Sequence, residues 1–180
     1  MFIKLNNVRI YYENLGQGLT LVFIHGLEEP SQSWHHQLNY FQKEYRSITL
    51  YLRVHGKSAN DASQIITIPL FTKDILTLLD YLNIKKAVII GYSMGGLICQ
   101  KIAAYYPDRL IAMVLSDTAG FYPPLFCTED LRERLAFLET ATMEDMAELD
   151  AEKCCSHYLT SEIRQEIKEL FLDNELEPYW

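Results

Sequence analysis

The first two thirds of the chain alternate between short apolar segments and longer amphipathic ones. The short segments are rich in β-branched and other apolar residues, and they comprise residues 19–24, 47–52, 87–90 and 110–115. Segments that can be buried on both faces are typical of strands in a parallel sheet covered by helices. Residues 8–12 instead alternate apolar and polar positions after the turn-prone pair Asn6 and Asn7, which predicts a strand in an opening hairpin.

The amphipathic segments lie between these strands and have the spacing of helices. Residues 33–44 repeat large apolar side chains on one face, residues 69–82 have a proline in the first turn, and residues 97–106 end before Pro107. Strands and helices that alternate at this spacing predict an α/β fold. We expect a doubly wound, mostly parallel sheet of about six strands.

The last third of the chain has a different pattern. Residues 128–140, 142–158 and 160–172 each open with threonine and carry acidic residues early, two features of helix N-termini. Net charge changes as well, from 11 − 9 = +2 over residues 1–124 to 5 − 15 = −10 over residues 125–180. We therefore expect a core over residues 1–124 and a helical lid over residues 125–180, with the boundary at Pro123 and Pro124.

Composition excludes several classes of protein. The chain has 180 residues, 49% of them hydrophobic, and a net charge of −8, which argues against disorder and against a nucleic-acid partner. No apolar run approaches the ~20 residues of a membrane span, and no signal-peptide core follows Met1, so we expect a cytoplasmic protein without membrane contact. The four cysteines, at positions 99, 127, 154 and 155, lack zinc-ligand spacing and are expected to be reduced thiols.

The strongest chemical signal is the sequence Gly-Tyr-Ser-Met-Gly at residues 91–95. A predicted strand precedes it and a predicted helix follows it, the setting in which a nucleophilic serine sits on a sharp turn. Gly91 and Gly95 leave room for Ser93 to adopt a strained backbone with an exposed hydroxyl. The alternative is a plain glycine turn in which the serine only caps the helix.

Together with the Phe-Ile-His-Gly-Leu segment at residues 23–27, this motif resembles the α/β-hydrolase family, in its branch of small esterases and 3-oxoadipate enol-lactonases. The resemblance implies a Ser93 nucleophile, with the backbone N–H groups of Leu27 and Met94 as the oxyanion hole. It also implies a small-molecule ester or lactone substrate, no cofactor and no metal. A third family segment matches only in part, because Tyr51 replaces the usual aspartate and Val54 the usual glycine.

A serine nucleophile needs a base, and the family order is Ser, then acid, then His. Of the five histidines, at positions 25, 35, 36, 55 and 157, only His157 follows Ser93, and it lies in the expected lid. Asp117, after the sixth strand, is the candidate acid; the alternative is a loop-capping aspartate. The sequence resembles the N-terminal two thirds of a hydrolase, so we expect little esterase activity from residues 1–180.

Two functions remain open at this point. The first is a serine hydrolase whose acid and histidine come from elsewhere. The second is a non-catalytic α/β-hydrolase-like binding protein or an inactive truncated remnant. In either case residues 110–115 have no charge and no proline. The family topology places this strand beside a seventh strand that residues 1–180 do not supply, so we expect it to be unpaired on one side. Such an edge favours self-association or a complementary chain.

Overall fold

The computed structural model describes residues 1–27, 31–58, 65–120, 133, 136–137, 140–149, 151 and 159–172. The chain divides into two compact units, Met1–Ala119 and Gly120–Trp180. The first unit ends five residues before the core boundary predicted at residue 124.

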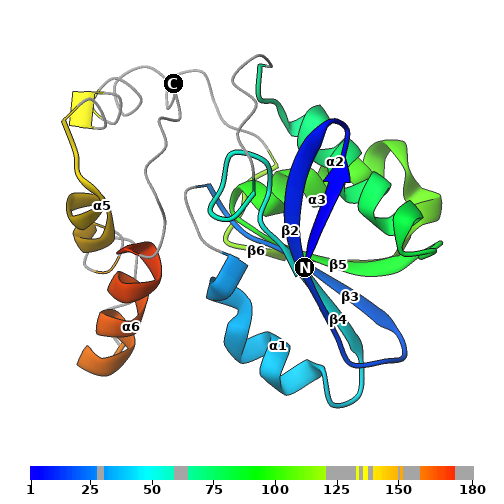
Figure 1. Ribbon diagram of the computed structural model, residues 1–180, viewed down its shortest axis with the longest axis horizontal. Helices are drawn as coiled ribbons and strands as arrows, with labels where there is room; N and C mark the ends of the chain where they lie inside the picture. The colour runs from blue at the N-terminus through cyan, green and yellow to red at the C-terminus, as the bar shows by residue number, and fades with distance from the viewer. Residues whose placement is uncertain are drawn as a thin grey trace. The chain divides into compact units, whose positions relative to one another are not determined.

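A six-stranded sheet forms the centre of the first unit (Figure 1). Its spatial order is β1 (Phe2–Leu5), β2 (Val8–Leu15), β4 (Arg46–Leu50), β3 (Thr20–Ile24), β5 (Ala87–Tyr92) and β6 (Leu110–Ser116). The pairs β1–β2 and β2–β4 are antiparallel, whereas β3–β4, β3–β5 and β5–β6 are parallel. The predicted mostly parallel α/β sheet of about six strands is confirmed.

Helices cover both faces of this sheet, as a doubly wound fold requires. They are η1 (Ser31–Trp34), α1 (His35–Phe41), α2 (Ile68–Tyr81), α3 (Met94–Tyr105) and η2 (Pro107–Arg109). The alternating side chains of β3 separate the two faces. Leu21 and Phe23 pack with Leu38 of α1, whereas Val22 and Ile24 belong to the larger core that contains residues of α2 and α3. Figure 1 shows α1 on one side of the sheet and α2 with α3 on the other.

Helix α2 begins where its sequence predicts. The Thr67 hydroxyl accepts a hydrogen bond from the Leu70 N–H at 3.3 Å, and Pro69 lies in the first turn. Both features favour a helix start because the first N–H groups of a helix lack partners within it. The buried face of α2 includes Phe71, Ile75 and Leu78, but also the carboxylate of Asp74.

Asp74 forms a buried ion pair with Arg53, which follows β4. The guanidinium donates from Nε to Oδ2 at 2.6 Å and from Nη2 to Oδ1 at 2.8 Å, and the two residues are 1% and 0% exposed. The Asn6 side-chain amide also donates to Asp74 Oδ1 at 2.8 Å. These bonds join the first hairpin, α2 and the segment after β4.

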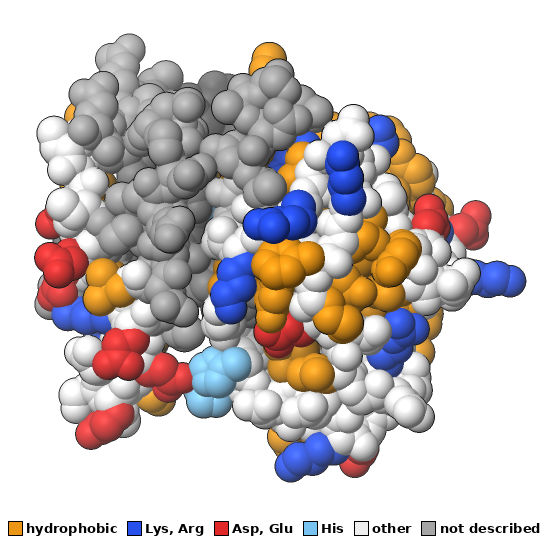
Figure 2. Space-filling view, in the orientation of Figure 1, with side chains coloured by type: hydrophobic (Ala, Val, Ile, Leu, Met, Phe, Trp, Pro, Cys, Tyr) orange, Lys and Arg blue, Asp and Glu red, His pale blue; other side chains and the backbone are white. Residues whose placement is uncertain are grey.

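The two edges of the sheet differ in charge. Within the described residues β1 pairs only with β2 and β6 only with β5. Near the β1 edge, the Arg9 guanidinium lies 4.7 Å from the centre of the Phe2 ring, and Figure 2 shows further basic side chains beside hydrophobic ones on this face. Strand β6 has no charged residue, yet its side chains from Ile111 to Leu115 are exposed. Charge protects an edge from pairing with other chains, so β6 is the less protected edge.

In the second unit the structure describes helices α5 (Met143–Leu149) and α6 (Ser161–Leu172). The Thr142 hydroxyl accepts from the Asp145 N–H at 3.2 Å, and Asp145 Oδ2 accepts from the Thr142 N–H at 2.8 Å. This reciprocal pair is a capping box, and it confirms the helix start predicted at Thr142. Residues 121–132 and 152–158 lie outside the described residues, and with them most of the predicted helix over 128–140. Among the described helices, none has the length and apolar character to cross a bilayer.

Candidate active site

Ser93 occupies a sharp turn between β5 and α3. Its backbone angles are φ 48° and ψ −114°, and α3 begins at the next residue. A positive φ in a residue with a side chain costs free energy, of order 1–3 kcal/mol, and it persists only where the surroundings fix it. The predicted strained turn is confirmed; the nucleophilic role of Ser93 remains a prediction.

The glycines around Ser93 are required by close backbone contacts. A Cβ atom on Gly91 would lie 2.3 Å from the Gly95 carbonyl oxygen, and one on Gly95 would lie 2.4 Å from the carbonyl oxygen of Ile24. Both distances are too short for any side chain. The close approach of Gly95 to Ile24 places the first turn of α3 against the end of β3. Leu27 follows three residues after Ile24.

The segment after β3 is held by the side chain of His25. This residue is fully buried; its Nε2 accepts from the Leu52 N–H at 3.0 Å, so Nδ1 carries the proton and donates to the Gly26 carbonyl at 2.6 Å. Burial, and then the neighbouring His55, lower the pKa of His25 to about 3. Neutral His25 therefore joins the turn before Leu27 to the end of β4, and both of its ring nitrogens are already engaged by main-chain groups.

His55, in the segment after β4, is buried as well. Its ring centre lies 4.9 Å from that of His25, and its Nδ1 is 2.9 Å from the Arg53 carbonyl oxygen. Burial lowers the pKa of His55 to about 4. It contacts other core residues, including Phe71, rather than the serine.

Val54 keeps the left-handed backbone that a glycine would adopt easily. Its φ is 59°, an unfavourable value for a β-branched residue. The residues on either side are both buried and hydrogen-bonded, Arg53 to Asp74 and His55 to the chain itself. We conclude that these two anchors impose the conformation of Val54.

Asp117 follows β6 and is exposed. Its φ of 44° is also left-handed, a conformation that aspartate tolerates better than most residues. Among the described residues, no hydrogen bond or ion pair joins its carboxylate to a histidine. Its role as the acid therefore stays a prediction.

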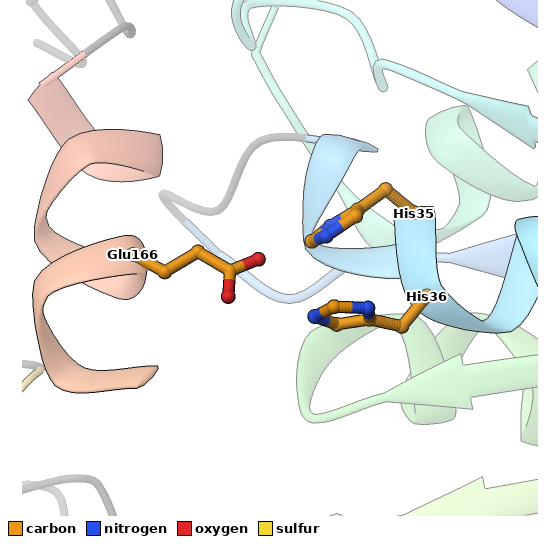
Figure 3. A group of neighbouring side chains, drawn as sticks. All are labelled: His35, His36 and Glu166. Carbon is orange, nitrogen blue, oxygen red and sulfur yellow. The ribbon is translucent and has the colours of Figure 1, made fainter. Parts of the chain in front are cut away.

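The remaining histidines do not supply a base within the described residues. His35 and His36 begin α1, as predicted, with ring centres 3.8 Å apart (Figure 3), and His35 Nδ1 lies 2.8 Å from the Gln32 carbonyl oxygen. Glu166, labelled in the same figure, belongs to α6 in the second unit. In the described part of the chain, no histidine forms a hydrogen bond with the Ser93 hydroxyl, and His157 lies outside that part.

Cys99 lies behind the serine turn in α3. Its sulfur would be 2.6 Å from a Cβ atom on Gly91, and its thiol is free. Burial raises the pKa of this thiol to about 12, so it stays protonated and unreactive. Cys99 is therefore a buried side chain of the core.

Comparison with known proteins agrees with this geometry. A family model described as the alpha/beta hydrolase fold matches residues 20–166. Over 116 residues, 63% of this chain, the sequence is 36% identical to epoxide hydrolase 4 of Mus musculus and 34% identical to 3-oxoadipate enol-lactonase 2 of Acinetobacter baylyi. These matches cover 32% and 43% of the relatives, so the chain spans well under two thirds of their length.

Solved structures share the fold. A thermophilic esterase from Thermogutta terrifontis superposes with a TM-score of 0.83 and 24% identity, covering 96% of this chain and 66% of the esterase. The enol-lactonase from Burkholderia xenovorans LB400 gives a TM-score of 0.80, also at 24% identity, covering 95% of this chain and 67% of that protein. The sheet order, the serine turn and the family match lead to one conclusion: the chain belongs to the alpha/beta hydrolase family.

Proposed function

We propose that this protein is a serine hydrolase of small carboxylic esters or lactones, with Ser93 as its nucleophile. The observation that supports this most directly is the left-handed backbone of Ser93 between β5 and α3. A serine that only caps a helix has an extended backbone and bonds its side chain to the first turn. Ser93 has neither feature, because its φ is positive and its side chain makes no capping hydrogen bond.

The Leu27 and Met94 amides are proposed to stabilise the tetrahedral oxyanion. Met94 is the first residue of α3, where N–H groups lack helical partners. Leu27 is two residues beyond the carbonyl of His25, which lies 2.9 Å from the Cβ position of Gly95. Loss of one such donor lowers the rate by about 10²–10³.

Several relatives are named epoxide hydrolases, but the chemistry of a serine argues for an ester or lactone. A carboxylate that opens an epoxide forms an ester, which water can cleave to regenerate the enzyme. A serine hydroxyl would form an ether, which has no carbonyl for water to attack. Attack of Ser93 on an ester or lactone carbonyl instead gives an acyl-enzyme that water hydrolyses.

The base that accepts the Ser93 proton is proposed to come from outside the described residues. His25 and His55 are buried and bonded to main-chain groups, and no described histidine forms a hydrogen bond with Ser93. Asp117 remains the candidate acid. We further propose a lid role for the second unit and, because Cys99 is a free thiol, a cytoplasmic location.

A fluorophosphonate probe should label this chain at Ser93, and Ser93→Ala should abolish the labelling. Stoichiometric labelling needs only one attack of the serine on each probe molecule, which can be slow. Sustained ester hydrolysis also needs a general base, which accelerates the reaction by a factor of about 10²–10⁴. We therefore expect an adduct with little p-nitrophenyl ester hydrolysis. Mass spectrometry of the digested adduct identifies the labelled residue.

Ser116→Ala is the matched control. Ser116 is a neighbouring serine whose carbonyl oxygen accepts a hydrogen bond from the Ser93 N–H, so the substitution leaves this main-chain contact in place. It should label as the wild type does. An adduct on another residue, or equal labelling of Ser93→Ala, would contradict the proposal. Absence of any adduct would support the alternative, a non-catalytic binding protein of the same fold.

We also propose that a second copy of this chain pairs with the edge of β6 opposite β5, where the described residues place no strand. Ile111, Met113, Val114 and Leu115 are 42–50% exposed on a strand without charge or proline. Two such strands can pair antiparallel about a two-fold axis. Sedimentation velocity over a concentration series should show dimers or larger species.

Met113→Lys should shift that distribution toward the monomer, because a charge on an edge strand opposes pairing. Tyr40→Lys is the control, since Tyr40 is 70% exposed on α1, away from this edge. A monomer at every concentration, or equal effects of both variants, would refute pairing through β6.

A further inference from the structure

The last residue of β6 and the segment after it hold the N–H and the carbonyl group of Ser93. The Ser93 N–H donates to the carbonyl oxygen of Ser116 at 3.0 Å. The Ser93 carbonyl oxygen accepts from the Gly96 N–H at 2.9 Å and from the Thr118 hydroxyl at 2.8 Å. Both backbone groups of the strained residue are therefore held, and two of the three bonds come from residues 116–118.

The route of the chain explains how Thr118 reaches the serine. The left-handed backbone of Asp117 turns the chain at the end of β6. Thr118 then lies on the first turn of α3, where its Cγ2 is 2.5 Å from the Cβ position of Gly96. One turn along α3, the Gln100 side-chain amide donates to the Ala119 carbonyl at 3.2 Å. The glycine at position 96 thus leaves the space that Thr118 fills.

We infer that Thr118 is a positioning residue for Ser93. Its hydroxyl donates to the Ser93 carbonyl and so favours the left-handed conformation that presents the serine side chain. A peptide at this φ and ψ returns to a commoner conformation unless its surroundings oppose the change. Thr118 acts through this main-chain bond and does not touch the substrate. The inference rests on the proposed role of Ser93 as nucleophile.

Thr118→Val tests this bond because valine has nearly the same shape and lacks the hydroxyl. The rate of fluorophosphonate labelling should fall by about three- to tenfold, the loss that corresponds to one hydrogen bond. Thr118→Ser retains the hydroxyl, so its labelling rate should stay within about twofold of the wild-type rate. That difference is smaller than the change expected for the loss of one hydrogen bond.

Thr72→Val is the matched control. Thr72 is buried and Thr118 half-buried, and the Thr72 hydroxyl likewise donates to a carbonyl, that of Ile68 at 2.8 Å, but it lies within α2. It should lower thermal stability without changing the labelling rate. Equal slowing by Thr72→Val and Thr118→Val would show that only general destabilisation was measured and would overturn the inference.

A second readout does not depend on Ser93 being reactive. Hydrogen exchange of the Ser93 amide, followed by NMR, should accelerate about three- to tenfold in Thr118→Val and remain unchanged in Thr118→Ser and Thr72→Val. If the wild type is not labelled but this exchange pattern is found, the proposed function fails and the positioning of the Ser93 backbone stands. If the wild type is labelled and neither readout responds to Thr118→Val, the inference is wrong and the proposed function stands.

Discussion

Replacing Asp74 with alanine should lower the free energy of unfolding by about 3–5 kcal/mol, because it removes the buried carboxylate that accepts two hydrogen bonds from the Arg53 guanidinium. Arg53 is 1% exposed and donates two hydrogen bonds to this carboxylate. Water cannot replace the lost partner at such a site. Denaturant unfolding followed by circular dichroism measures the change.

An exposed ion pair in the same unit provides the control. Arg109 Nη2 lies 2.7 Å from Asp80 Oδ1, and the Asp80 side chain is 68% exposed. Asp80→Ala should cost less than about 1 kcal/mol, since water solvates both charges after the change. If the two aspartate variants lose the same stability, burial is not what makes the Arg53 pair important.

The second large effect is a loss of stability on acidification, caused by His25 and His55. Their pKa values in the folded protein are about 3 and about 4, below the ordinary value of 6.5 that applies when the chain unfolds. The unfolded chain therefore binds more protons than the folded one between these values. Burying the two imidazoles in their neutral form therefore carries no free-energy penalty above about pH 6.5. As the pH falls below this value the free energy of unfolding decreases, by at most about 5 kcal/mol for His25.

The slope of stability against pH measures this proton uptake. With two histidines, the free energy of unfolding should change by about 2.7 kcal/mol per pH unit between about pH 4.5 and pH 5.5, where the unfolded chain is largely protonated. His55→Gln removes one titrating group and should lower the slope to about 1.4 kcal/mol per pH unit. An unchanged slope in this variant would show that other groups cause the acid sensitivity.

Acid would act close to the proposed site. His25 bonds to the Gly26 carbonyl, and Gly26 precedes the proposed oxyanion donor Leu27. Protonation of Nε2 would remove the acceptor for the Leu52 N–H, since a doubly protonated imidazole has only donors. The turn before Leu27 and the end of β4 would then lose their connection together.

The position of the serine turn could be predicted from the sequence because its signals are local. Gly91 and Gly95 flank Ser93 at fixed spacing, and the neighbouring periodicities identify a strand before it and a helix after it. The apolar and uncharged character of β6 is equally local. Asp74 carried a local signal as well, since it lies among the apolar residues Phe71, Ile75 and Leu78 on the buried face of α2. A lone carboxylate on such a face indicates a buried partner but does not identify it.

Only the tertiary structure decided which distant residues meet. Arg53 and Asp74 are 21 residues apart, and Ser93 and Thr118 are 25 apart. His55 lies in the core because the Arg53 pair draws its segment inward, and the same anchoring imposes a left-handed backbone on Val54. Sequence periodicity reports which face of one element is buried. Contacts between elements depend on the order of strands in the sheet and on where each connecting segment ends, and no local pattern carries that information.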